Sequence, residues 1–322
     1  MTDQLDIDES LIDYKYHGQR VDIVLAQHFP QFSRSQLTQW LKEGIITLNN
    51  RIYKPKEKVL GGERIDFKYS PRQAVEVDQA EDIALDIIFE DDYVLVINKP
   101  AGLVVHPGAG NKQHTLLNAL LYHHPALQEL PRAGLIHRLD KDTTGLLVIA
   151  KTLAAYTHLI REMQARAIER RYYALVYGHL IGGGRIETGY GRHPRNRLKM
   201  AVCKQGREAV TLYNVYKQYG YCTLLDVALM TGRTHQIRVH LSHINHSLIG
   251  DPLYGGRIRF PAGSTPELRT ILHAFKRQAL HAYSLAFMHP TTGQLLTCSA
   301  SLPDDLQSLL NELDNYFDSF DR

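Results

Sequence analysis

Apolar residues at helical spacing mark the first element that the pattern of the chain predicts. Three of them lie between Ser33, which is a good N-cap, and Gly44, which favours the end of a helix. Residues 45–48 then show the pattern of a short strand, and an Asn-Asn turn follows. The pattern indicates a small module of helix, turn and hairpin over residues 16–70.

From residue 83 onward, short apolar runs separated by turn residues predict strands in hairpins. The paired runs are residues 87–89 with 94–97, 210–216 with 221–229, and 282–288 with 295–300. Two further strands are expected over residues 146–150 and 172–177, and three helices over residues 152–168, 235–244 and 303–317. Because hairpins outnumber strand–helix–strand units, we expect an α+β fold with a mixed, mostly antiparallel sheet.

The stretch between these two regions is polar and lacks any periodicity, so it is expected to be a linker. The chain has 322 residues, which is more than one average domain and fits two. We therefore expect a small domain over residues 16–70, a linker over residues 71–82 and a large domain over residues 83–322.

Composition argues against several classes of protein. Hydrophobic content is 44% and charged content 22%, as in ordinary soluble domains, and no apolar run approaches the roughly 18 residues of a membrane span. The acidic N-terminal sequence lacks the pattern of a signal peptide, so we expect a cytoplasmic protein, with a monomer as the default. The three cysteines are far apart, which predicts neither a disulfide framework nor a thiolate zinc site.

The net charge is only +3, but the charges are unevenly distributed. Residues 1–13 and 304–322 are acidic, whereas the body between them has 36 basic and 23 acidic residues, a net charge of +13. Such a body suits a protein that binds a polyanion. The candidate phosphate contacts are Arg34, Lys54 and Lys56 in the small module and Arg192, Arg195 and Arg197 in a basic stretch over residues 192–207. A solvated basic surface is the alternative at both places.

A dense cluster of charged residues lies between residues 133 and 145, after an apolar start and before a buried strand. Functional sites are often built on loops of this kind at the edge of a sheet. The residues alone leave a second interpretation open. Asp142 is followed by Thr-Thr-Gly, which is good turn chemistry, so the cluster could equally be a capped turn.

The sequence HRLDKDTTGLLVIAKT, over residues 137–152, resembles the catalytic motif of the RluA-type pseudouridine synthases. The nucleophile of that family is an aspartate, and its position corresponds to Asp140 here. Residues 16–70 resemble the S4 RNA-binding domain that many members carry. The resemblance extends over roughly residues 16–310 and implies an S4-like domain followed by a synthase domain.

Two further motifs of the family occur in the expected order. RRYYA, over residues 170–174, matches the tyrosine motif and places the active-site tyrosine at Tyr172. TGRTHQIRVH, over residues 231–240, matches the third motif and places the active-site arginine at Arg238. Shorter matches include GDPLYGG, over residues 250–256, for which no role is implied.

The resemblance implies that the protein isomerises uridine to pseudouridine in large-subunit (23S) ribosomal RNA, with the helix 69 hairpin as the expected target. Two alternatives stay open: other uridines of the same RNA, or a catalytically silent RNA-binding factor in ribosome assembly. The carboxylate of Asp140 would attack C1′ of the ribose or add to C6 of the base, and either route is nucleophilic catalysis. A neighbouring guanidinium would stabilise the ionised carboxylate, and Arg238 is the candidate.

An enzyme that acts on a stacked base must flip it out of the helix. Arg138 resembles the family arginine that fills the vacated space, while a structural salt bridge is its alternative role. Arg233 could instead contact phosphate. The partner is therefore expected to be ribosomal RNA or a large-subunit precursor particle, with no metal and no cofactor, because the rearrangement transfers no electrons.

Three histidines recur at every third position over residues 240–246 and could form a stripe on a helix. Histidine is a common metal ligand, so a metal-dependent hydrolase is a rival interpretation. No cysteine or glutamate nearby completes a zinc site and the HExxH pattern is absent, which favours structural histidines.

Overall fold

The computed structural model describes residues 7–29, 32, 34–67, 79–108, 111 and 113–318. The chain forms two compact units, Met1–Asp78 and Gln79–Arg322. Two sequence expectations fall partly outside the described residues: the N-cap role of Ser33, and most of the linker expected over residues 71–82.

The smaller unit combines a three-stranded antiparallel sheet with short helices. Its elements are β1 (Ile7–Leu11), a 3-10 turn (Tyr14–Tyr16), α1 (Val21–His28), α2 (Arg34–Glu43), β2 (Ile46–Leu48) and β3 (Arg64–Phe67), and the strand order is β1-β3-β2. The core lies between the helices and the sheet and includes Leu25, Leu37, Trp40 and Ile65. The first helix and first strand were not predicted, because neither follows a clear capping or turn signal.

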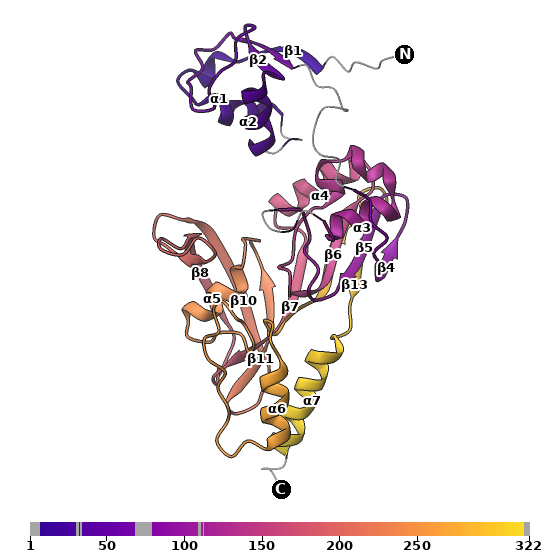
Figure 1. Ribbon diagram of the computed structural model, residues 1–322, viewed down its shortest axis with the longest axis vertical. Helices are drawn as coiled ribbons and strands as arrows, with labels where there is room; N and C mark the ends of the chain where they lie inside the picture. The colour runs from indigo at the N-terminus through magenta and orange to yellow at the C-terminus, as the bar shows by residue number, and fades with distance from the viewer. Residues whose placement is uncertain are drawn as a thin grey trace. The chain divides into compact units, whose positions relative to one another are not determined.

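The larger unit is built on one sheet of ten strands (Figure 1). The strands are β4 (Ile87–Glu90), β5 (Val94–Lys99), β6 (Thr144–Ala150), β7 (Glu169–Tyr177), β8 (Gly184–Arg192), β9 (Met200–Val202), β10 (Arg207–Gln218), β11 (Cys222–Leu229), β12 (Leu280–Met288) and β13 (Leu295–Ser299). Their order is β4-β5-β6-β12-β7-β11-β10-β8-β9, with β13 paired to β12. Among the strand pairs that the structure describes in this sheet, β6–β12 alone is parallel, so the prediction of a mixed, mostly antiparallel α+β fold is confirmed.

In the described part of the larger unit, five α-helices accompany this sheet. They are α3 (Leu116–His123), α4 (Leu153–Gln164), α5 (Gln236–His243), α6 (Pro266–Ala274) and α7 (Asp304–Asp318), and the last two lie side by side (Figure 1). Two short 3-10 segments, Pro125–Glu129 and Pro131–Gly134, lead into the charged loop. Among the described residues, no helix is both long and apolar enough to cross a bilayer.

Some predicted boundaries were wrong. The helix expected up to Ile168 ends at Gln164, because Arg166 adopts a left-handed φ of 61° and turns the chain toward β7. Part of the basic stretch over residues 192–207 is a strand, β9, that pairs with β8. Helix α3 was missed because nearly all of its residues are buried, so its sequence shows no polar face.

Candidate active site

The loop that carries Asp140 is a tight turn at the start of β6. The amide of Thr143 donates to the carbonyl of Asp140 over 3.1 Å, and the next residue begins a strand that is buried along its whole length. The preceding Leu139 is packed in the main core, so the turn is fixed on both sides. The side chain of Asp140 keeps 15% of its surface exposed, which makes its carboxylate accessible.

The start of α5 is locked to the neighbouring strand β10 by one amide side chain. Gln236 donates to the carbonyl of Val210 and to the hydroxyl of Thr211, both over 3.0 Å. It also accepts hydrogen bonds from the Thr231 hydroxyl and the Arg233 amide. This network fixes the first turn of α5, which carries Arg238 on its inner face.

Arg238 joins two carboxylates. Its Nη1 donates to Oδ2 of Asp140 over 2.9 Å, and its Nε and Nη2 hold both oxygens of Asp251 over 2.8 and 2.9 Å. Burial opposes the charge of the guanidinium, but the hydrogen bonds to Asp251 outweigh burial and raise the pKa of Arg238. The sequence expectation that Arg238 would lie beside the carboxylate of Asp140 matches this geometry.

Asp251 was missed as a member of the site, although it lies in the GDPLYGG sequence. Its side chain is fully buried and also accepts hydrogen bonds from the amides of Leu253 and Tyr254 over 2.8 and 3.0 Å. Burial alone would raise its pKa, but the hydrogen bonds from Arg238 and these amides lower the pKa below its usual value. The signal available in the sequence was an Asp-Pro turn between glycines.

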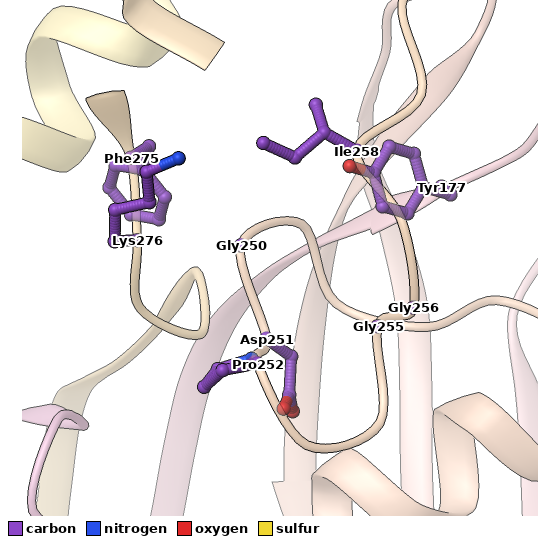
Figure 2. Close-up of a pocket in the computed structure, with 9 residues that line it drawn as sticks. All are labelled: Tyr177, Gly250, Asp251, Pro252, Gly255, Gly256, Ile258, Phe275 and Lys276. Carbon is purple, nitrogen blue, oxygen red and sulfur yellow. The ribbon is translucent and has the colours of Figure 1, made fainter. Parts of the chain in front are cut away.

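A cavity of about 130 Å³ is lined in part by the same loop, including Asp251. Figure 2 shows it bounded by Tyr177 and Ile258 on one side and by Phe275 and Lys276 on the other, while the Asp251 carboxylate points away from Tyr177 and Ile258.

Tyr172 and Tyr173 point to opposite faces of β7. Tyr172 is 4% exposed and packs in the same core cluster as Leu139. Burial raises its pKa, and the negative charge of Asp140 adds to this effect against the opposing charge of Arg170. Tyr173 stacks on Tyr283 on the other face, with ring centroids 4.0 Å apart. Only Tyr172 therefore lies on the side of Asp140.

A buried lysine, Lys99, supports the loop that carries Asp140. Lys99 has no exposed surface, and its three N–H groups donate to the carbonyls of Pro100, Leu103 and Lys141 over 2.6, 2.9 and 2.8 Å. Burial lowers the pKa of Lys99 to about 7, although the charges of Asp142 and Asp140 oppose that shift. Sequence analysis assigned no role to this lysine.

The segment after α6 supports the loop from a second side. Arg277 donates to the carbonyl of Asp142 over 3.3 Å and forms two hydrogen bonds with Asp305 of α7. Gln278 donates to the hydroxyl of Thr143 over 3.0 Å. Asp142 thus contributes its backbone to the turn, in line with the structural role expected of it.

The other predicted contacts lie outside this cluster. Arg138 is exposed and makes no hydrogen bond or ion pair with any residue the structure describes. Arg233 donates to the carbonyl of Glu208 over 3.3 Å, and Arg192 donates to the carbonyl of Arg197 over 2.8 Å. Arg195 and Arg197 are exposed near the end of β8. In the smaller unit, Lys54 and Lys56 are exposed, and Arg34 forms an ion pair with Asp22 over 2.6 Å.

The three histidines of residues 240–246 do not converge on a common point. His240 is buried against the hydroxyls of Thr211 and Thr188, whereas His246 contacts the carbonyl of Tyr177 over 2.8 Å. Within the described ranges, no group of three or more His, Cys, Asp or Glu side chains could hold a metal ion. The arrangement gives no support to the hydrolase interpretation.

The structure brings together the carboxylate of Asp140 and the buried side chains of Arg238 and Tyr172, which the resemblance to the synthases singled out. The family model for RNA pseudouridylate synthases matches residues 93–243, and the S4 domain model matches residues 19–65. The chain therefore belongs to the RNA pseudouridylate synthase family and carries an S4 RNA-binding domain.

Curated relatives match nearly the whole chain. The ribosomal large subunit pseudouridine synthase D of Haemophilus influenzae is 51% identical and covers 92% of this chain and 91% of its own length. The enzyme of the same name from Xanthomonas campestris is 49% identical, with 92% and 89% covered. Among solved structures, human RNA pseudouridylate synthase domain containing 4 matches with a TM-score of 0.55 and 26% identity, over 71% of this chain and 92% of that one.

Proposed function

We propose that this enzyme converts specific uridines of large-subunit ribosomal RNA to pseudouridine, with Asp140 as the nucleophile. The observation that carries the proposal is the unequal environment of the two carboxylate oxygens of Asp140. Arg238 holds Oδ2 over 2.9 Å, while Oδ1 accepts no hydrogen bond from the described residues. A carboxylate with one oxygen anchored by a guanidinium and the other without a hydrogen bond is prepared for nucleophilic attack.

The reaction needs few groups. The C1′–N1 bond of uridine breaks, the base turns, a C1′–C5 bond forms, and the proton lost from C5 is matched by one gained at N1. Asp140 attacks either C1′ or C6 and leaves again at the end. Tyr172, whose pKa burial keeps raised, remains a neutral phenol that can stack on the base. No electrons are transferred, so the proposal includes neither metal nor cofactor.

Reaching a stacked uridine requires base flipping. Arg138 lies two residues before Asp140, is exposed, and has no partner in the described part of the chain. Its guanidinium is therefore available to occupy the space that the base leaves and to stack there as a planar group. We assign the phosphate contacts to Arg233, to Arg192, Arg195 and Arg197, and to Arg34, Lys54 and Lys56 of the S4 domain.

The relatives named as large-subunit synthases support ribosomal RNA as the substrate, and we propose the uridines of the helix 69 hairpin as the target. The enzyme would then act as a monomer in the cytoplasm, on the RNA or on a precursor particle. Mapping pseudouridines in ribosomal RNA from a deletion strain, with and without the gene restored, tests the target. Loss of pseudouridine elsewhere, with helix 69 unchanged, would exclude that hairpin.

Variants of Asp140 test the chemistry. Asp140→Asn keeps the shape of the side chain but removes the negative charge, so pseudouridine formation should be abolished while RNA binding stays within a few-fold. Asp140→Ala should behave in the same way. Single-turnover formation of pseudouridine and a filter-binding assay measure the two properties separately. Turnover near that of the unmodified enzyme in either variant would exclude Asp140 as the nucleophile.

A further inference from the structure

His235 has a backbone conformation that its place in the fold does not explain. It stands at the N-cap of α5 with φ 59° and ψ 20°, in the left-handed region that residues other than glycine rarely adopt. Its side chain makes no hydrogen bond to the first turn of the helix, so the strain is not offset by capping. Strained residues of this kind cluster at functional sites.

The left-handed backbone directs the imidazole into the Asp140 cluster. Nε2 lies 3.8 Å from Oδ1 of Asp140, the oxygen that Arg238 does not hold. Nδ1 lies 3.0 Å from the hydroxyl of Tyr254, and the two rings meet edge to face. The ring is thus placed between a tyrosine hydroxyl and the free oxygen of the carboxylate.

Tyr254 determines which nitrogen of His235 carries the proton. Its hydroxyl accepts a hydrogen bond from the amide of Met200 over 2.8 Å. Among the described residues, its one other hydrogen-bond partner is Nδ1 of His235, so the hydroxyl proton is donated to that nitrogen. The neutral imidazole then carries its own proton on Nε2, facing Asp140.

From these contacts we infer that His235 is a positioning residue for Asp140. Its Nε2–H donates to Oδ1 once the RNA is bound and the 3.8 Å separation shortens, because hydrogen bonds in empty sites are often long. The donor fixes the rotation of the carboxylate, so that Oδ1 faces the ribose or base. This inference rests on the proposed role of Asp140 as nucleophile.

The charge state of His235 must stay neutral for this role. Burial lowers its pKa below the usual value, and Arg238 and Arg138 act in the same direction, against the charges of Asp140 and Asp251. Protonation at low pH would put a second N–H on Nδ1, facing the Tyr254 hydroxyl, and would turn the contact with Asp140 into an ion pair that weakens the nucleophile.

Two variants with the same backbone strain separate the hydrogen bond from packing. In His235→Gln the amide nitrogen reaches the position of Nε2 and keeps an N–H donor, whereas His235→Phe keeps a planar ring without a donor. We expect kcat in steady-state pseudouridine assays to fall about 10- to 100-fold in the Phe variant and only a few-fold in the Gln variant. KM for the RNA should change little in both.

The pH profile supplies a readout that packing would not move. Unmodified enzyme should lose activity on an acid limb below pH 6.5, and in His235→Gln that limb should shift to the lower range where carboxyl groups titrate. Tyr254→Phe removes the donor to Nδ1, which raises the pKa of His235 and moves the limb to higher pH. Equal kcat in the Gln and Phe variants, or an acid limb that none of the three changes, would overturn the inference.

Asp140→Asn is included in the same assays. If Asp140→Asn is inactive and His235→Phe is as active as the unmodified enzyme, the role of His235 fails and the proposed function stands. If Asp140→Asn is active, the proposed function itself fails. Melting curves for every variant exclude loss of fold as the cause.

Discussion

Replacing Asp251 by Asn tests how the fold holds Arg238. The substitution keeps the size of the side chain and removes the charge that faces the guanidinium on two of its nitrogens, over 2.8 and 2.9 Å. Arg238 has a side chain that is only 6% exposed, so water cannot replace the lost partner. The variant therefore leaves a buried cation that only Asp140 compensates.

The magnitude follows from the burial of the pair. Removing one partner of a buried ion pair costs about 3–5 kcal/mol, and we expect the lower end, because Nη1 keeps its contact with Asp140. A domain the size of the larger unit loses about 2–4 °C of Tm per kcal/mol, so Tm should fall by roughly 6–12 °C. Thermal and urea unfolding, followed by circular dichroism, measure the change.

The change of folding stability with pH gives an independent test of the role of Asp251. Because the pKa of Asp251 is lower in the folded than in the unfolded chain, its contribution is complete above the unfolded value of about 3.9. That contribution is lost as the pH falls through the folded pKa, since the folded state then binds the proton that the unfolded state already carries. In Asp251→Asn, the free energy of unfolding should therefore decrease less as the pH is lowered than in the unmodified protein.

Two controls make the reasoning refutable. Glu187→Gln breaks an ion pair with Arg185 in which both side chains are about half exposed, and should leave Tm unchanged. The double variant Arg238→Met with Asp251→Asn removes the buried cation and leaves only Asp140, whose side chain is 15% exposed, without its partner, so it should be more stable than Asp251→Asn alone. A Tm for Asp251→Asn within 2 °C of the unmodified protein, or a double variant that is the less stable of the two, would refute the argument.

Three other predictions concern base flipping, RNA binding and metal dependence. Arg138→Ala should lose much activity on a folded hairpin and less on a flexible single strand, and Arg138→Lys should rescue only partly; equal losses on both RNAs would show a role other than filling the stack. Replacing Lys54 and Lys56 by Glu should weaken RNA binding and reduce the slope of log K against log salt concentration by roughly one to two units. Binding assays at several salt concentrations measure this slope. An unchanged slope would assign these lysines to a solvated surface. Full activity is expected in excess chelator, and a loss that zinc restores would favour a metal role.

Most of the sheet and the motif residues were predictable because their signals are local, whereas β8 and β9 were not predicted. Apolar runs on both sides of turn residues predict hairpins. Asp140, Tyr172 and Arg238 each lie in a contiguous motif. The contacts that join these motifs are not local: 98 residues separate Arg238 from Asp140. Nothing in either segment specifies the distance between their side chains.

The supports of the site were harder to foresee. In the sequence, Lys99 looks like an ordinary polar residue at the end of a strand. In the structure it is buried, and it donates a hydrogen bond to the carbonyl of Lys141, 42 residues later in the chain. Asp251 was missed because its sequence looks like an ordinary turn. Arg238, which donates to both of its carboxylate oxygens, lies on another element. Buried polar groups need partners, but a sequence does not say where those partners are.

The order in which the chain is made has a consequence for the loop around Asp140. Arg277, Gln278 and His281 contact residues 142–144 of that loop and of β6, and up to 137 residues separate the partners. At roughly 5–20 residues per second, a ribosome needs about 7–27 s to synthesise that interval. During this time the loop is present without these partners. The site is therefore completed only late in translation, so a nascent chain cannot modify RNA at full rate while most of its length is still being made.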